Sequence, residues 1–81
     1  MRIDKFLKVS RLIKRRTIAN EACDADRIIV NGRVAKASYN VKIGDIIELS
    51  FGQRALKVEV LSISEHVSKG SAPTLYRELF S

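Results

Sequence analysis

Eighty-one residues, of which 46% are hydrophobic, are enough for one folded domain with a small core and argue against a disordered basic tail. No apolar run approaches the roughly 20 residues that a membrane-spanning helix requires, and the charged start lacks the apolar stretch of a secretory signal, so we expect a cytoplasmic protein. The formal net charge of +6 comes entirely from residues 1–16, where seven Lys and Arg residues accompany one Asp, and such a concentration of cations points to a polyanionic partner.

The first predicted element is an amphipathic helix over residues 4–15, with Asp4 as a suitable N-cap. On a helical wheel Lys8, Arg11 and Arg15 fall on one side, and most apolar side chains fall on the opposite side. A solvated surface helix would show the same periodicity. Solvated faces usually mix both signs of charge, however, and this one has almost no acid.

A second helix is predicted from Thr17, another N-cap residue type, to about Asp26, after a tight connection at residues 14–16. The pattern then becomes extended. Residues 28–30 are β-branched, the Asn31-Gly32 pair is the strongest two-residue hairpin signal, and residues 33–35 can pair back.

Later turn signals divide the rest of the chain. Gly44 and Asp45 precede a strand at residues 46–51, and residues 52–54 turn into a strand at residues 56–61. Residues 64–74 have the composition of a surface loop, and residues 75–80 are predicted to add one or two helical turns that dock on the body.

The predicted fold is therefore α+β, with two N-terminal helices packed on a small, mainly antiparallel sheet of about four strands and a short C-terminal tail or helical turn. Residues 1–63 form the domain in this interpretation, and residues 64–81 form the loop and tail. Cys23 is the only cysteine and is expected in the core, and His66, the only histidine, is expected in solvent. No metal, cofactor or catalytic pair is predicted.

Four segments together resemble the RNA-binding domain named after ribosomal protein S-four: RIDKFL at residues 2–7, RRT at 15–17, RIIVNGRVAK at 27–36 and VKIGD at 41–45. The resemblance covers about residues 1–60 and implies the S-four-like fold, also called the αL motif. It also implies recognition of structured RNA by shape and phosphate. Many relatives have glycine where this chain has Asp26, so we expect that corner to differ slightly, because aspartate tolerates a left-handed C-cap less well.

The resemblance assigns RNA contacts to the basic helical face, the second helix start and the hairpin. By position these residues are Arg2, Lys5, Lys8, Arg11, Lys14, Arg15, Arg16, Thr17, Arg33 and Lys36. Asp4 is expected to cap the first helix or to orient neighbouring arginines.

The chain opens with MRIDKFLKVSRLIKRRT at residues 1–17, and this segment and the length resemble the RqcP family of bacterial ribosome-associated quality control. This resemblance implies a non-catalytic factor that binds split large ribosomal subunits through ribosomal RNA and P-site tRNA. Such a factor helps its partner RqcH to add C-terminal alanine tails to stalled chains. No membrane partner is implied, and we expect a monomer.

Three alternatives stay open. A heat-shock-type large-subunit recycling factor or another ribosomal-RNA-binding protein would share the same surface, although the heat-shock relatives carry a longer basic C-terminal extension. A DNA-binding helix-turn-helix needs base-reading side chains at the start of its second helix, where only Asn20 qualifies. An enzyme would need a nucleophile and a base that the sequence does not offer.

Overall fold

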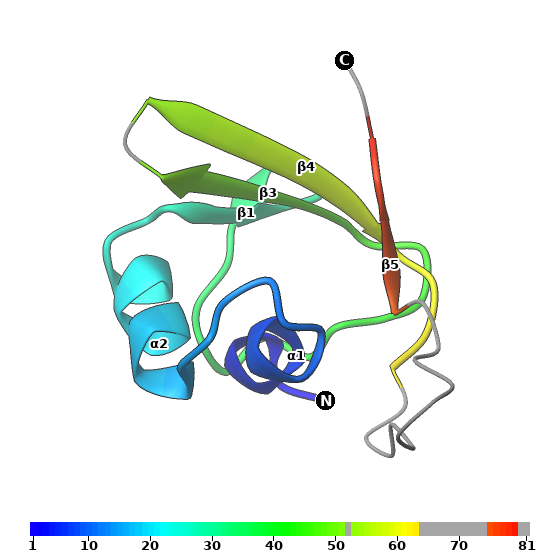
Figure 1. Cartoon of the computed structure of the whole chain (residues 1–81), viewed down its shortest axis with the longest axis horizontal. Coiled ribbons are helices and arrows are strands. Elements are labelled where there is room, and N and C mark those ends of the chain that lie inside the picture. Colours follow the sequence, from blue (N-terminus) through cyan, green and yellow to red (C-terminus); the bar gives the residue numbers. More distant parts are fainter. Residues whose placement is uncertain (52, 64–74, 80–81) are drawn as a thin grey trace.

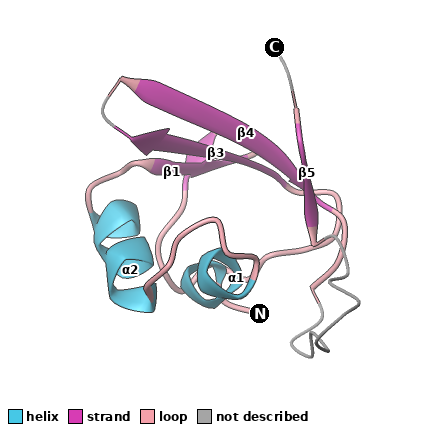
Figure 2. Cartoon of the chain, viewed as in Figure 1, coloured by secondary structure: helices cyan, strands magenta, loops and turns pink. Residues whose placement is uncertain are grey.

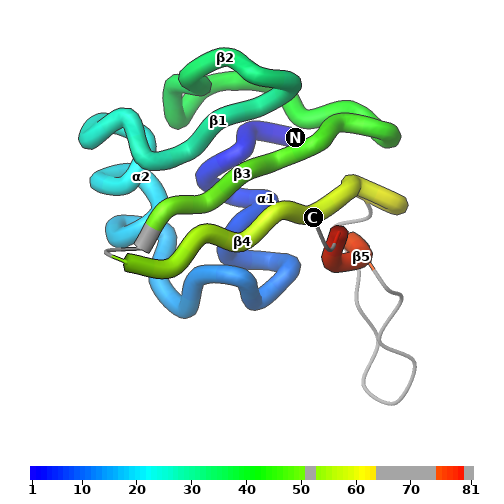
Figure 3. The backbone as a smooth tube through the Cα atoms, turned by 90° about the horizontal axis from the view of Figure 1, so that it is seen from above, coloured from blue at the N-terminus to red at the C-terminus, as the bar shows by residue number. Residues whose placement is uncertain are grey.

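Two short helices cover one face of a five-stranded sheet in the computed structural model, which describes residues 1–51, 53–63 and 75–79 (Figures 1 and 2). The elements are α1 (Ile3–Val9), α2 (Arg16–Asp24), β1 (Ile28–Val30), β2 (Arg33–Val34), β3 (Ile46–Phe51), β4 (Arg54–Val60) and β5 (Tyr76–Glu78). Across the sheet the order is β2-β1-β3-β4-β5, with antiparallel pairing throughout (Figure 3). The predicted α+β fold is confirmed, with five strands in place of about four. Neither helix has the length and apolar character to cross a membrane.

The first helix begins earlier than predicted, with Arg2 and not Asp4 as its N-cap. Its free N–H groups find tertiary partners, because Ile3 donates to the Tyr39 carbonyl at 2.7 Å and Asp4 donates to the Ala37 carbonyl at 3.4 Å. Strand-like contacts from the segment after β2 therefore replace a local side-chain cap.

The same helix also ends earlier, at Val9 and not near residue 15. Arg11 adopts a left-handed φ of 65°, and its N–H donates to the Lys8 carbonyl at 3.0 Å. The Ile13 N–H then donates to the Leu7 carbonyl at 3.0 Å. These bonds stop the helix and turn the chain, so that Ile13 enters the core with 5% of its surface exposed.

The second helix has Arg15 as its N-cap, so the prediction that Thr17 caps it is wrong. The helix ends at Asp24, and Asp26 follows with a left-handed φ of 59°. Asp26 donates its N–H to the Cys23 carbonyl at 3.1 Å, and Arg27 donates to the Ala22 carbonyl at 2.9 Å, which is the Schellman arrangement. Asp26 thus takes up the left-handed conformation that glycine usually supplies, and a slight difference from the corner of the relatives stays a prediction.

The β1–β2 hairpin is confirmed, with Asn31 at φ 52° and Gly32 at φ 84° in its two-residue turn. The longest pairing joins β3 to β4, and β4 begins at Arg54, before the predicted start at residue 56. Gly52, in the predicted turn between these strands, lies outside the described residues.

The predicted helical turn at residues 75–80 is wrong, because residues 76–78 form the edge strand β5. Leu75 is 5% exposed, and its carbonyl accepts N–H bonds from Leu61 and Ser62 at 2.8 and 3.2 Å. This segment therefore pairs with the free edge of β4 and becomes part of the sheet. The predicted loop at residues 64–74, His66 and Phe80 lie outside the described residues, and a domain boundary at residue 63 stays a prediction.

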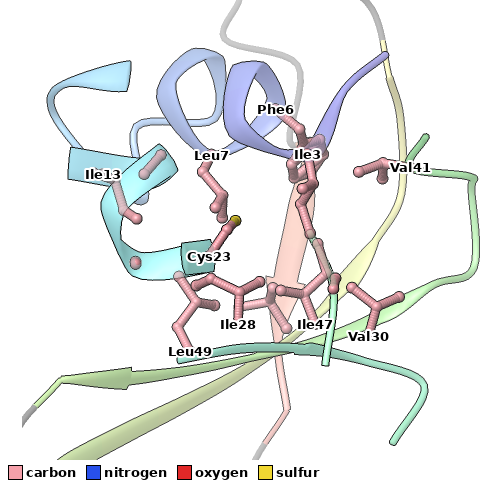
Figure 4. Packing of buried hydrophobic residues seen from close by; sticks show 14 of the residues in the cluster. Ile3, Phe6, Leu7, Ile13, Cys23, Ile28, Val30, Val41, Ile47 and Leu49 are labelled. Carbon is pink, nitrogen blue, oxygen red and sulfur yellow. The ribbon is translucent and has the colours of Figure 1, made fainter. Parts of the chain in front are cut away.

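The core lies between the helices and the sheet (Figure 4). Ile3, Phe6 and Leu7 of α1 are fully buried, and α2 contributes Ala19, Ala22 and Cys23. The sheet supplies Ile28, Val30, Ile47, Leu49, Val58 and Val60. Helices of seven and nine residues are marginal by themselves, so burial of these side chains stabilises them. The expected core position of Cys23 is confirmed.

Candidate RNA-binding surface

The first cations of the two helices meet at one buried carboxylate. Arg16, the first residue of α2, donates from Nε to Oδ2 of Asp4 at 3.2 Å, and Arg2 Nε lies 3.2 Å from Oδ1. The Asp4 side chain is 3% exposed, whereas those of Arg2 and Arg16 are 49% and 45% exposed. Asp4 therefore holds two guanidinium groups whose remaining donors can reach solvent or an anion.

The environment keeps Asp4 ionised. Burial raises the pKa of this carboxyl, but the hydrogen bonds from Arg16 and from the Lys5 N–H, at 2.8 Å, lower it. The positive charges of Arg16 and Arg2 lower it further, and together these contacts outweigh burial and hold the pKa below its ordinary value. The carboxylate is thus an orienting group between cations.

The cations at the end of α1 are distributed differently from the helical-wheel prediction. Lys5 is half-buried and Lys8 exposed on α1, whereas Arg11, Lys14 and Arg15 are exposed on the connection to α2. These side chains do not form one stripe along a helix. Arg11, Lys14 and Arg15 instead lie in the connection that leads to Arg16, whose guanidinium Asp4 holds.

Backbone pairing brings the segment that follows β2 to the start of α1. The segment after β2 bonds to Ile3 and Asp4, and Arg2 forms an isolated antiparallel bridge with Asn40. Lys36 directly precedes Ala37, whose carbonyl accepts the Asp4 N–H. Lys36 and Arg33 are both exposed, and Lys36 lies beside the start of α1 because of the Ala37 bond.

A shallow hollow of about 350 Å³ adjoins the held arginines. It is lined by Asp4, Arg16, Thr17, Asn20 and Glu21. Thr17 and Asn20 place short polar side chains on the first turns of α2, next to Arg16. Hydroxyl, amide and guanidinium donors at this spacing suit the oxygens of a phosphodiester backbone.

A second buried carboxylate, that of Asp45, holds the hairpin in place, although the sequence indicates only a turn at this position. Asp45 is 7% exposed and accepts bonds from Asn31 Nδ2 at 3.1 Å, the Tyr39 hydroxyl at 2.8 Å and the Lys42 N–H at 2.9 Å. Asn31 Oδ1 in turn accepts the Ile46 N–H at 3.0 Å. The Asn-Gly and Gly-Asp turn signals marked both ends of this network, but not their contact.

Both titratable members of this network have shifted pKa values. Burial raises the pKa of Asp45, but the bonds from Lys42, Tyr39 and Asn31 outweigh it and leave the pKa below its ordinary value. The bond that Tyr39 donates to Asp45 raises the pKa of the phenol. Tyr39 therefore stays a neutral donor to a charged acceptor, which is a strong arrangement.

Cys23 is inert where it lies. Burial, with the charges of Asp4 and Asp24, raises the pKa of its thiol to about 11. A buried thiol with so high a pKa is a poor nucleophile.

Comparison with known proteins places this surface in a family. The S4 domain family matches residues 1–47. A Halalkalibacterium halodurans protein called an RQC P-site tRNA stabilizing factor is 58% identical over 76 residues, which cover 94% of this chain and 86% of the relative. A Bacillus subtilis protein of the same name is 51% identical, with 94% and 88% covered.

A solved structure has the same fold as this chain. The trimeric structure of Vibrio cholerae Heat Shock Protein 15 matches with a TM-score of 0.85 and 32% sequence identity, over 98% of this chain and 81% of that chain. The match extends beyond the helix pair and hairpin to nearly the whole described sheet. The chain therefore belongs to the S4 domain family and, within it, to the family of RQC P-site tRNA stabilizing factors.

Proposed function

We propose that the chain is a non-catalytic RNA-binding factor of bacterial ribosome-associated quality control. It binds split large ribosomal subunits through ribosomal RNA and P-site tRNA, and it supports the alanine tailing of stalled chains by RqcH. The relatives' name supports the P-site tRNA and quality-control parts of this proposal. We extend this role to the large subunit, its ribosomal RNA and RqcH.

One observation carries the proposal: the buried Asp4 holds the half-exposed guanidinium groups of Arg2 and Arg16 side by side. Phosphate contacts of this kind provide affinity and fix orientation, because each neutralised phosphate releases counterions. We further propose that all ten predicted contact residues face RNA, with Lys5 contributing from its half-buried position.

The proposed role is to hold a substrate in place. A factor without chemistry of its own promotes a reaction by keeping the reacting groups in a productive position. The chain would raise the occupancy of peptidyl-tRNA on the large subunit while RqcH delivers the next residue.

Cosedimentation with separated ribosomal subunits, with and without peptidyl-tRNA, tests the binding step. Arg16→Ala should weaken binding and lower the slope of log affinity against log salt by about 1, because one phosphate contact is lost. Lys57→Ala is the matched control, since Lys57 is exposed on β4 and neighbours the buried Val58, which places it on the opposite face of the sheet from the helices. Equal binding of both variants at two salt concentrations would contradict the proposed surface.

Tailing in cells tests the role. Deleting the gene should reduce alanine tailing while RqcH is still present, and the Arg16→Ala protein should fail to restore it at normal expression. Undiminished tailing in the deletion strain, with intact ribosomes and not split subunits copurifying, would remove the quality-control role and leave RNA binding.

A heat-shock-type recycling factor is the second candidate, favoured by the likeness to Heat Shock Protein 15. It predicts large-subunit binding that does not affect tailing. We also propose that the chain acts as a monomer, unlike the trimeric Vibrio structure, and light scattering should then give a mass near 9.1 kDa.

A further inference from the structure

A groove beside the β1–β2 hairpin shares only Arg33 with the residues proposed above to contact RNA. Its volume is about 510 Å³. The lining residues are Val30, Asn31, Arg33, Val34, Ala35 and Tyr39. The groove thus combines apolar side chains with one aromatic ring and one guanidinium group.

The buried network around Asp45 engages the polar atoms of two lining residues. Asn31 uses its amide nitrogen on Asp45 and its amide oxygen on the Ile46 N–H, and Tyr39 donates its hydroxyl to Asp45. What these residues leave for a ligand is mainly carbon surface, held rigidly by a charged acceptor. The groove is therefore suited to stacking and not to reading a particular pattern of donors and acceptors.

Arg33 is the lining residue with donors to spare. Within the described ranges its guanidinium makes no hydrogen bond or ion pair, and the side chain is exposed on β2. A guanidinium plane stacks on nucleobases and also pairs with phosphate. Its position at the groove links a flat apolar site to an anionic backbone.

The groove also borders the basic surface. Tyr39 accepts the Ile3 N–H through its carbonyl, so the wall of the groove is joined to the start of α1, where Arg2 and Asp4 lie. RNA bound at Arg2 would therefore lie near this wall of the groove. Paired bases in an RNA helix are not accessible to such a site, whereas an unpaired base can be turned out and stacked on an aromatic ring.

We propose that the hairpin groove receives one unpaired nucleobase of the bound RNA, stacked against Tyr39 and Arg33. This inference rests on the proposed RNA-binding function and deepens it by naming the class of RNA feature recognised. Stacking itself does not require a particular base, because every base has a flat face that an aromatic ring or a guanidinium plane can contact.

The test uses two RNA hairpins with the same stem. One carries a single bulged 2-aminopurine, and the other carries this fluorescent base paired with uridine. The protein should bind the bulged hairpin about fivefold or more tightly than the paired one, with quenched 2-aminopurine fluorescence, since a base–aromatic stack has that effect on affinity. Equal affinities for the two hairpins would overturn the groove proposal.

Two substitutions at Tyr39 separate stacking from hairpin positioning. Tyr39→Phe and Tyr39→Leu both remove the hydroxyl that donates a hydrogen bond to Asp45, but only Tyr39→Leu removes the aromatic ring. Tyr39→Phe should keep the preference for the bulge, and Tyr39→Leu should lose it while binding the paired hairpin as before. An equal loss in both variants would show that Tyr39 acts only through Asp45, and would also overturn the proposal.

A second pair of variants serves if circular dichroism shows that the Tyr39→Leu protein is unfolded. Val34 is 53% exposed, so Val34→Glu should fold and place a carboxylate at the groove. It should abolish the bulge preference, whereas Ala55→Glu, the same charge at an exposed position on β4, should retain it. If Val34→Glu keeps the preference, the groove does not hold the base.

The same experiment distinguishes the two proposals. Arg16→Ala should weaken the binding of both RNA hairpins equally and leave the preference for the bulged one unchanged. If the protein binds neither hairpin at low salt and no large subunit, RNA binding itself fails. If it binds both hairpins equally well, only the groove proposal fails.

Discussion

Replacing Asp4 with asparagine separates the charge of the basic corner from its geometry. Asp4→Asn raises the net charge by one unit, so a view based on charge alone predicts RNA binding that is at least as tight. The structure predicts weaker binding. Asp4 is buried and accepts hydrogen bonds from Arg2, Arg16 and the Lys5 N–H. An asparagine can still accept the Lys5 N–H with its amide oxygen, but its amide nitrogen, a donor, then faces the two arginines.

The size of the effect follows from the freedom that the two arginines regain. Immobilising a rotamer-rich side chain on binding costs about 0.5–1.5 kcal/mol, so two released arginines weaken binding by about 2 kcal/mol. The added positive charge recovers about 0.5 kcal/mol, the scale of an exposed ion pair. The net loss of about 1.5 kcal/mol corresponds to roughly tenfold weaker binding.

Fluorescence anisotropy with labelled RNA, repeated over a range of salt concentrations, measures both quantities. Because Asp4→Asn retains both arginines, its salt slope should stay close to that of the unmodified protein, unlike the slope of Arg16→Ala. Asp24→Asn makes the same change of charge at an exposed site on α2 and should bind slightly more tightly. Unchanged or tighter binding by a folded Asp4→Asn protein would refute the orienting role.

Three further predictions concern stability and reactivity. Asp26→Gly should stabilise the fold by about 0.5–1 kcal/mol and raise the melting temperature by about 2–8 °C, because glycine takes the left-handed φ of 59° without strain, and an unchanged or lower melting temperature would contradict this. Asp4 and Asp45 have lowered pKa values, so their stabilisation is complete above the ordinary carboxyl value of 3.8 and is lost as the pH falls through their lower folded values. As the pH falls, the free energy of unfolding measured with urea should therefore decrease less for Asp45→Asn than for the unmodified protein. Parallel pH profiles of the two proteins would argue against the network. Cys23, whose thiol pKa is raised to about 11, should react with a disulfide-exchange reagent near neutral pH only after unfolding, and rapid labelling of the folded protein would contradict its burial in the core.

Local sequence determined the elements whose conformation depends on adjacent residues. Asn31 and Gly32 both accept a positive φ, which the two-residue hairpin turn requires, and the β-branched residues before them favour an extended strand. The charge of the first sixteen residues is likewise visible in the sequence, as is its attraction for polyanions.

Tertiary structure decided where those charges lie and how they are held. Helical periodicity cannot reveal that Arg11 turns left-handed and ends α1 at Val9, because that conformation is stabilised by Ile13 entering the core. The Asp4–Arg16 pair joins residues twelve positions apart, and Asn31 meets Asp45 across fourteen. Such contacts form only when helices and hairpin pack on one another, since the free energy that places them comes from the shared core and not from neighbours along the chain.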